Sequence, residues 1–446
     1  MKVMLIHPAK TLNLKFDYLK SYQPLFAAYL SSYLKNDNHE VKFLDVFAKG
    51  FNRRQENEKL TRIGLSPDEI SKEIESFGPE VVGVSCIYTF QFPDAIEIVD
   101  IVKNVDPRIA TVIGGNHITG VYKGGNKTAE DFANLNLRLG ITEESIDYKV
   151  IGSGEIAMVN LVNSLKKGIN PEKNVIGTNI NLSNSLLPDF SIYEKNDYPA
   201  ATFRASSGKE KFSMPYMSSR GCTNICDYCT TNMMWGRGFT HYTSEQNKTN
   251  LLNIKKQGYG EIGLHDDNML LNKNYALELF EQIHSLDFEW TLLAIDRSRT
   301  DEKIIDSIIK NGCSHMFFSV ETPNTKNLVE RGKITYKNAD NDKTIEHIKK
   351  LSENRISIEM DFMIGFPNET MKDIQRTVDY GNKLLEIGAT NAIYIPVTPL
   401  PGTELYNKVR GKIEWEKGYD GFTLTKSNLN LGFDISKILL ENTKYL

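Results

Sequence analysis

Three cysteines within eight residues constrain this chain more than any other feature of its sequence. Cys222, Cys226 and Cys229 follow the spacing C-x3-C-x2-C, and the chain has only five cysteines in all. Residues 212–217 read as a short strand and Gly221 as a turn, so we expect the cysteines on a loop that leaves a strand end. Thiolates are soft ligands that suit iron–sulfur clusters and zinc. On a four-iron cluster, three of them would leave one iron open to a substrate or cofactor.

Zinc binding and disulfide formation are the alternative uses of these cysteines. A structural zinc site needs four ligands, and the nearest further candidate, His241, follows Cys229 in no standard spacing. Three close cysteines cannot all pair as disulfides, and the short, quickly polar N-terminus does not read as a secretion signal. The cysteine usage therefore fits a reducing cytoplasm, and the spacing favours an iron–sulfur cluster.

With Tyr228 directly before its last cysteine, the motif resembles the signature of the radical S-adenosylmethionine (SAM) superfamily. The resemblance implies a [4Fe–4S] cluster on Cys222, Cys226 and Cys229, whose open iron chelates SAM, with Tyr228 near the adenine. It also implies that the reduced cluster cleaves SAM to methionine and a 5′-deoxyadenosyl radical. An electron donor such as flavodoxin or ferredoxin is then an expected partner.

The overall composition excludes several other classes of protein. A chain of 446 residues predicts two or three domains, and 40% hydrophobic with 25% charged residues is typical of a soluble protein. The net charge of −4 lacks the excess of basic residues that is typical of nucleic-acid-binding proteins. No run approaches the roughly 20 apolar residues of a membrane-spanning helix. We therefore expect a cytoplasmic protein without a membrane span or a nucleic-acid partner.

The first 180 residues alternate predicted strands with predicted helices. Strands are expected at 2–7, 40–45, 81–85, 110–115 and 148–152, and helices at 24–34, 67–76 and 94–105. Such alternation predicts right-handed βαβ units and a parallel sheet. Ligands of such sheets bind beyond the carboxyl ends of the strands, where this chain has Ser85, Gly114 and Gly115. Tight turns that any α/β fold needs are the alternative reading of these small residues.

The order of these segments is similar to the cobalamin-binding domain that precedes the core in one subfamily of radical SAM enzymes. The matching pieces include 79–85, 113–115 and 152–155. The resemblance implies that Ser85 lines the corrin or its nucleotide tail, and that Gly114 and Gly115 let the tail pass close to the backbone.

The chain departs from cobalamin domains that supply a histidine to cobalt, because their motif D-x-H-x-x-G is absent. His7 and His117 do not lie in such a motif, and we expect each to be a loop histidine without a ligand role. Cobalamin bound without a protein ligand to cobalt and a domain that has lost cobalamin both stay open. An auxiliary cluster of the methylthiotransferase kind is not expected, since Cys86 is the only cysteine of this region. Cys313 is expected to be a buried apolar residue.

From residue 206 the alternation resumes with longer helices and resembles the partial (βα)6 barrel of radical SAM enzymes. Strands are expected near 212–218, 261–265, 289–295, 315–321, 357–365 and 391–397. The predicted fold class is therefore α/β, a Rossmann-like cobalamin-binding-type parallel sheet followed by a partial (βα)6 TIM-like barrel. The predicted domains are 1–178, a linker at 179–205, the radical SAM core at 206–410 and a short extension at 411–446. In the extension, Trp415 and Tyr419 are expected to cover the barrel mouth or to pack beneath it.

Active sites of such barrels form at the carboxyl ends of the strands, and the resemblance assigns residues there to SAM. Asp266 and Asp267 would receive its ammonium group, with helix capping as the alternative. Glu321 would reach the ribose or the methionine end. Ile364 and Gly365 would lie near the adenine.

Four further residues are weaker candidates. Arg297 and Arg299 could bind the SAM carboxylate. Arg237 could bind phosphate or carboxylate bidentately, or it could be a surface arginine. Glu369 is expected in the first turn of a helix rather than as a ligand.

Together the resemblances imply hydrogen abstraction from an unactivated carbon of a small-molecule substrate. If cobalamin is present, methylcobalamin would then donate a methyl group to the substrate radical. Ring closure, rearrangement or oxidation without methyl transfer is the second hypothesis, and a non-enzymatic zinc module is the third. The residues do not identify the substrate.

Overall fold

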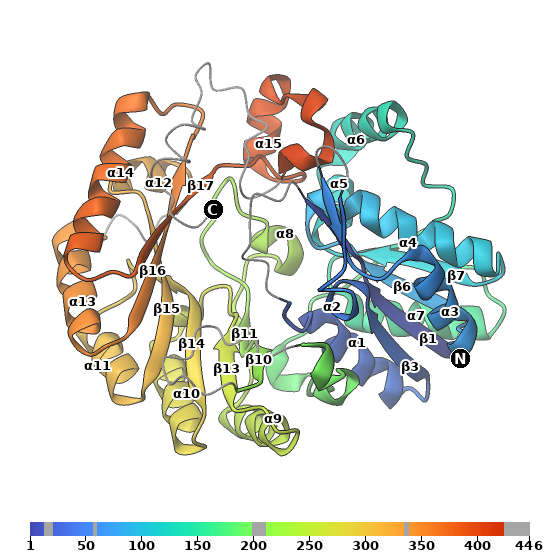
Figure 1. Ribbon diagram of the computed structural model, residues 1–446, viewed down its shortest axis with the longest axis horizontal. Helices are drawn as coiled ribbons and strands as arrows, with labels where there is room; N and C mark the ends of the chain where they lie inside the picture. Colours follow the sequence, from blue (N-terminus) through green and yellow to red (C-terminus); the bar gives the residue numbers. More distant parts are fainter. Residues whose placement is uncertain (13–20, 57–59, 199–210, 334–338, 423–446) are drawn as a thin grey trace.

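The computed structural model describes residues 1–12, 21–56, 60–198, 211–333 and 339–422. Two parallel six-stranded sheets form its two halves, and their carboxyl ends face a common interior (Figure 1). Residues 199–205 of the predicted linker and 423–446 of the predicted C-terminal extension lie outside the described residues. The predicted α/β class with two successive parallel sheets is confirmed.

The N-terminal sheet has the strand order β3-β1-β6-β7-β8-β9. Its strands are β1 (Lys2–His7), β3 (Glu40–Asp45), β6 (Val81–Ser85), β7 (Ala110–Gly114), β8 (Tyr148–Ile151) and β9 (Asn174–Ile176). The central strands are nearly continuous apolar runs because helices cover both faces of the sheet. The parallel register pairs His7 with Asp45, so the ends of β1 and β3 lie side by side. Five of these strands were predicted, and the three-residue edge strand β9 was not.

Alternate residues of the strands supply two separate cores. Val3, Leu5 and Val112 pack with α1 (Leu25–Asn36) and α7 (Gly154–Lys166) on one face. On the other face, residues such as Met4 and Val82 pack with α3 (Pro67–Phe77) and α4 (Phe92–Val105). The remaining helices of this half are α2 (Val46–Lys49), α5 (Asn116–Lys123) and α6 (Gly125–Leu139).

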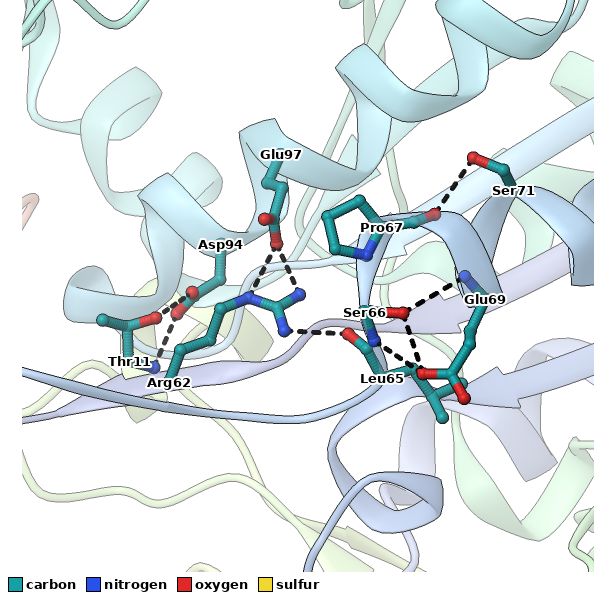
Figure 2. Close-up of polar contacts among 9 residues, drawn as sticks. All are labelled: Thr11, Arg62, Leu65, Ser66, Pro67, Glu69, Ser71, Asp94 and Glu97. Atoms are coloured by element: carbon teal, nitrogen blue, oxygen red, sulfur yellow. Dashed lines mark hydrogen bonds and ion pairs between the residues drawn. The ribbon is translucent and has the colours of Figure 1, made fainter. Parts of the chain in front are cut away.

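A small antiparallel sheet lies beside α4 and was not predicted, because its three strands are only three residues long. It consists of β2 (Lys10–Leu12), β5 (Thr61–Ile63) and β4 (Arg54–Glu56). Figure 2 shows how polar contacts attach it to the helix. Asp94 accepts hydrogen bonds from the Thr11 amide (3.0 Å) and hydroxyl (2.5 Å), and Arg62 donates to Glu97 at 2.7 Å. Burial raises the pKa of Asp94 to about 7.

The second sheet has its strands in chain order, β10-β13-β14-β15-β16-β17, as a partial (βα)6 barrel requires. The strands are β10 (Ser213–Tyr216), β13 (Glu261–Leu264), β14 (Glu289–Asp296), β15 (Cys313–Glu321), β16 (Ser357–Ile364) and β17 (Asn391–Pro396). Its larger helices are α9 (Ser244–Lys256), α10 (Lys273–Ser285), α11 (Glu302–Lys310), α13 (Asn341–Glu353) and α14 (Met371–Glu386). They lie on the side of the sheet away from the N-terminal half (Figure 1). All six predicted strands are confirmed.

The short segments around residue 230 and after residue 400 connect the two halves. They comprise β11 (Ser219–Arg220), β12 (Thr240–His241), α8 (Thr231–Trp235) and α15 (Glu404–Val409), whereas α12 (Thr325–Glu330) follows β15 in the barrel half. The described part of the linker, residues 179–198, contains three 3-10 turns, Leu182–Asn184, Phe190–Ile192 and Lys195–Asp197. None of the helices described here is long and apolar enough to cross a bilayer.

The end of the described chain packs on the N-terminal half. Tyr419 lies among the rings of Phe92, His117 and Phe132, and its hydroxyl donates to Asn136 at 2.7 Å. Trp415 meets Phe132 edge-on, with ring centroids 5.5 Å apart. The expectation that these aromatics cover or underlie the barrel mouth is wrong, because helices α4 to α6 offer them an apolar surface.

Candidate active site between the two sheets

One cavity of about 490 Å³ lies where the carboxyl ends of the two sheets face each other. Ser85, Gly114 and Gly115 line its N-terminal wall at the ends of β6 and β7. Asp267 and Trp235 line the opposite wall, from the barrel and from the segment after the cysteines. The structure thus places the predicted cobalamin residues and part of the predicted SAM region around the same space.

The N-terminal part of this cavity continues as an apolar slot between the sheet and helices α1 and α7. Leu30, Val112, Val150 and Met158 line it, and Gly83 lies in the middle of β6 without a side chain. A Cβ at Gly83 would lie 3.2 Å from the ends of the Leu5 and Met158 side chains. The slot therefore exists because the central strand lacks a side chain at this point, and its apolar lining suits an extended ligand tail.

At the cavity edge, Gly115 is required by its backbone conformation. Its φ of +115° disfavours other residues, and a Cβ there would collide with the carbonyl oxygen of Cys86. Gly114 is the last residue of β7, next to it. These positions let a ligand approach the backbone closely, which agrees with their predicted role without testing it.

The cysteine loop is held in place through its own backbone. The Ile225 amide donates to Gly332 at 3.1 Å, the Asp227 amide to Arg331 at 2.9 Å, and the Asp227 carbonyl accepts from Leu405 at 2.8 Å. Cys222 and Cys226 are half-buried thiols and Cys229 is an exposed one. The three cysteines are therefore presented on one anchored loop, as the spacing predicts.

The three thiols of this loop are one ligand short of a closed tetrahedral zinc site. Within the described ranges, no three His, Cys, Asp or Glu side chains lie close enough together to hold a metal ion, the three cysteines included. Burial raises the pKa of the Cys226 thiol to about 12, although Lys333 opposes this. A thiolate at this place needs positive charge beside it, and iron bound to the three sulfurs would supply that charge.

Asp266 and Asp267 hold the cysteine loop against the end of β10. Asp266 accepts hydrogen bonds from the hydroxyls of Ser218 (2.7 Å) and Ser219 (2.5 Å), and burial raises its pKa to about 6. Asp267 accepts from the Gly221 amide at 2.8 Å and the Thr231 hydroxyl at 3.1 Å. These contacts bracket the three cysteines. The predicted contact with the SAM ammonium stays a prediction, and Asp267 is the one of the two that lines the cavity.

Tyr228 and Glu321 contact each other, and their predicted roles at the adenine and at the ribose or methionine end of SAM stay predictions. The Tyr228 hydroxyl donates to Glu321 at 3.1 Å, and Lys333 forms an ion pair with the other carboxylate oxygen. Glu321 has a φ of +62°, which is uncommon for a residue other than glycine and clusters at functional sites. Asp361 lies nearby, and burial followed by the charge of Glu321 raises its pKa to about 6. Sequence reasoning missed Lys333 and Asp361, since nothing in their local pattern marks them.

Ile364 is the last residue of β16 and Gly365 follows it, and Glu369 does not lie in the first turn of a helix as expected. Its carboxylate accepts hydrogen bonds from the amides of Gly365 (2.8 Å) and Phe366 (3.0 Å). It precedes Thr370, the N-cap of α14, and closes the turn between strand and helix. Ile364 is fully buried. The proximity of these residues to adenine stays a prediction.

A buried ion pair between the two halves was not predicted from the sequence. Arg220, directly before the cysteine loop, donates to Glu155 at the start of α7 at 2.5 Å, and both side chains are buried. The guanidinium lies 4.2 Å from the ring centroid of Tyr29 and 4.7 Å from that of Trp235. Burial alone would lower the pKa of Arg220, but the charge of Glu155, the neighbouring Tyr29 and Tyr242 and the hydrogen bond to Glu155 together raise it above its usual value. The two residues are 65 positions apart, so only the fold could show the pair.

The remaining candidates have structural or surface positions. Arg297 is buried and donates to Thr322 at 2.9 Å and Asn341 at 2.8 Å, which ties the end of β15 to α13. The Arg299 Nε lies 3.9 Å from Asp296. Arg237 is exposed, which favours the surface reading. Binding of the SAM carboxylate by Arg297 or Arg299 stays a prediction.

The other residues singled out in the sequence are enclosed by protein. Cys313 is buried in β15, as expected, and Cys86 is buried after β6. His117 is not a loop histidine, because it lies in α5 inside the aromatic cluster of Phe92, Phe132 and Tyr419. Burial lowers its pKa to about 3.

Comparisons with known proteins agree with this geometry. Residues 216–381 match the family described as Radical SAM superfamily, and residues 17–133 match the B12 binding domain. The chain is 24% identical to the cytidylyl-2-hydroxyethylphosphonate methyltransferase of Streptomyces wedmorensis, across 96% of this chain and 86% of that protein. It is 25% identical to the anaerobic magnesium-protoporphyrin IX monomethyl ester cyclase of Rubrivivax gelatinosus, across 93% and 71% of the two chains.

Among solved structures, the fold is similar to that of the radical SAM methyltransferase TsrM of Kitasatospora setae, determined with tryptophan and a SAM analogue. The TM-score is 0.65 at 17% identity, and the alignment covers 92% of this chain and 76% of TsrM. Both matched regions, the cysteine motif and the facing sheet edges lead to one conclusion. The chain belongs to the radical SAM superfamily, in the subfamily that carries a B12-binding domain ahead of the radical SAM core.

Proposed function

We propose that this protein is a cobalamin-dependent radical SAM methyltransferase that methylates an unactivated carbon of a small molecule. One observation carries the proposal: the ends of the N-terminal strands and the segments around the cysteine loop line the same cavity. A methyl donor held on one wall and a SAM-derived radical formed at the other would therefore reach the same substrate atom. Fixed positioning of this kind is the protein's main contribution to cofactor chemistry.

Each wall has its own residues for this task. Cys222, Cys226 and Cys229 would hold the cluster, and Tyr228 with Glu321 would position the SAM nucleoside. When bound, the reduced cluster supplies the electron that cleaves SAM, and cobalamin supplies the methyl group.

On the other wall, Ser85, Gly114 and Gly115 would border the corrin, and the slot beside Gly83 would receive its tail. Arg220, fixed by Glu155, lies between the two regions. Its cation lies over the rings of Tyr29 and Trp235, and all three residues line the shared cavity.

The cluster requires an external reductant, and we propose a flavodoxin or ferredoxin for this role. Cys229 is the exposed member of the motif, which makes its side of the loop the natural approach for an electron donor. Five free cysteines and an oxygen-sensitive cluster are consistent with a cytoplasmic location.

A second function is favoured by the similarity to the protoporphyrin ester cyclase. In that case the radical would lead to ring closure, rearrangement or oxidation, and no methyl group from SAM would enter the product. The same cysteines and the same cavity would serve both reactions, so the fate of the methyl group decides between them.

The test is an anaerobic purification with cobalamin supplied, followed by iron and cobalt assays and incubation with methyl-labelled SAM and a reductant. We expect iron near four per chain, stoichiometric cobalt, 5′-deoxyadenosine, and label in the bound cobalamin together with S-adenosylhomocysteine. Iron and 5′-deoxyadenosine without cobalt or label transfer would overturn the methyltransferase proposal in favour of the second function. Zinc in place of iron would overturn both.

A further inference from the structure

Arg331 lies where segments that carry predicted SAM residues meet. It follows β15 and is the C-cap residue of α12, and its side chain is only 9% exposed. Nη1 of its guanidinium group lies 3.5 Å from Asp227 Oδ2 on the cysteine loop. Cζ of the same group lies 4.4 Å from the centroid of the Phe366 ring, directly after Gly365. One cation therefore contacts both the cysteine loop and the turn that follows β16.

Asp227, which accepts from this cation, lies directly before Tyr228. Its side chain is 4% exposed, and the same carboxylate oxygen also accepts from Lys408 at 3.2 Å. The Asp227 amide donates to the Arg331 carbonyl oxygen at 2.9 Å. Nε of the guanidinium group donates to Asn327 at 3.1 Å, so the planar group is held through two of its nitrogens. These contacts fix the part of the cysteine loop that carries Tyr228.

Phe366 connects the cation to the ring of Tyr228. The two rings meet edge to face, with centroids 5.7 Å apart and planes at 61°. Phe366 is fully buried in a small core that includes Leu328 of α12. Tyr228 donates its hydroxyl to Glu321 at 3.1 Å, so it is restrained at the hydroxyl by a carboxylate and at the ring by Phe366. A guanidinium over an aromatic face is a favourable contact, and Arg331 therefore supports the ring that Phe366 presents to Tyr228.

We propose that Arg331 is a positioning residue for SAM, which orients the Tyr228 ring through Phe366 and the loop backbone through Asp227. The inference rests on the predicted place of Tyr228 near the adenine, and it names the group that holds the ring there. Arg331 is not among the described residues that line the cavity, so we expect its effect on SAM to pass through these neighbours. An arginine that only attached α12 to the barrel would affect the stability of the protein and not its affinity for SAM.

The test is equilibrium dialysis of the anaerobic, iron-loaded protein against radiolabelled SAM without a reductant, with iron assayed in the same samples. Arg331→Gln should raise the Kd for SAM by about tenfold at unchanged iron content, which is the lower end of the effect of outer-shell residues on metal affinity. Arg331→Lys should have a smaller effect, because an ammonium group keeps the charge beside Asp227 but lacks the plane that stacks on Phe366. Arg376→Gln is the control, since this arginine of α14 is 63% exposed and should leave the Kd unchanged.

A double-mutant cycle shows whether Arg331 acts through Tyr228. Tyr228→Leu should also raise the Kd, and in that background Arg331→Gln should add little, because the ring that Arg331 orients is gone. Equal losses of affinity in both backgrounds would overturn the inference, as would an unchanged Kd in Arg331→Gln. If Arg331→Gln does not retain iron, Phe366→Leu tests the same chain of contacts without a change beside Asp227. We expect a raised Kd in that variant, and an unchanged Kd overturns the inference.

The measurement requires neither cobalamin nor methyl transfer, so its outcome is independent of the methyltransferase proposal. An unchanged Kd in Tyr228→Leu would overturn the predicted place of Tyr228 and this inference with it. A raised Kd in Tyr228→Leu together with an unchanged Kd in Arg331→Gln would overturn only the role of Arg331.

Discussion

The two sheets present chemically opposite edges to the cavity they share. At the N-terminal edge much of the lining is glycine, small residues and an apolar slot, with a few polar side chains such as His7 and Lys10. At the barrel edge, carboxylates are fixed by backbone amides or hydroxyl groups, as Asp267 is by Gly221 and Thr231. The first edge is suited to a large ligand through its shape, and the second to charged groups through specific donors and acceptors.

This difference predicts different responses to substitution. A ligand atom of a cluster cannot be replaced by packing, so its loss should abolish function. A binding surface formed by glycines and other small residues should lose ligand binding gradually, in proportion to the side-chain volume that a substitution adds. Similar responses of the two edges to such substitutions would contradict this difference.

The largest expected effect is at the cysteine loop. Cys226→Ala leaves two thiolates for the cluster, and we expect loss of bound iron and of 5′-deoxyadenosine formation. Iron assay and product chromatography measure both. Cys313→Ala is the matched control, because that thiol is buried in β15 and should leave iron content unchanged. Normal 5′-deoxyadenosine formation by Cys226→Ala would refute the assignment of the cluster.

The next effect concerns the ion pair that joins the two edges. Glu155→Gln leaves the Arg220 charge buried without its partner, and breaking such a pair costs about 3–5 kcal/mol of unfolding free energy. Urea unfolding followed by circular dichroism measures the change. Glu330→Gln removes an exposed carboxylate 3.9 Å from Lys326 and should cost less than about 0.5 kcal/mol. Equal effects of the two variants would show that the buried pair does not hold the halves together.

The long strands of both sheets and the cysteine motif could be predicted from the sequence, whereas the shortest strands could not. Apolar runs and helical periodicity predicted five strands of the first sheet and all six of the second, because burial on both faces imposes long apolar strands. The cysteine motif could be recognised from the sequence because Cys222, Cys226 and Cys229, the three predicted cluster ligands, lie on one short loop. Three-residue strands such as β4 and β9 carry no such pattern, and their existence depends on neighbours in space.

The candidate site was predictable only where its parts are local. Asp266 and Asp267 were singled out correctly as residues at a strand end, but their bonds to Ser218 and Gly221 depend on a loop 46 or more residues earlier. The pairs Arg220–Glu155 and His7–Asp45 likewise join distant segments. Such contacts follow from strand order and register, and single-sequence patterns do not contain them.

A smaller, graded effect is expected in the apolar slot. Gly83→Val adds a side chain where a Cβ would lie 3.2 Å from Leu5 and Met158, whose flexible ends can shift. We expect a loss of about 1–3 kcal/mol in stability from overpacking and reduced cobalt content, with iron content unchanged. Val82→Ile is the control, since Val82 packs into the core on the opposite face of the same strand. Full cobalt content in Gly83→Val would show that the cofactor tail does not use the slot.

The smallest expected effect lies outside the cavity, in the contacts that hold β2 and therefore Lys10 beside the N-terminal edge. The pKa of Asp94 is about 7 in the folded protein and ordinarily 3.8, so between these values the folded state binds the additional proton. The unfolding free energy should therefore fall as pH rises from about 5 to 7, by at most about 2 kcal/mol from this group. Asp94→Asn resembles the protonated carboxyl and should reduce that slope in urea titrations at several pH values, whereas Asp68→Asn, at an exposed position of α3, should not. An unchanged slope in Asp94→Asn would mean that Thr11 keeps the carboxylate charged, and that the attachment of β2 does not depend on pH.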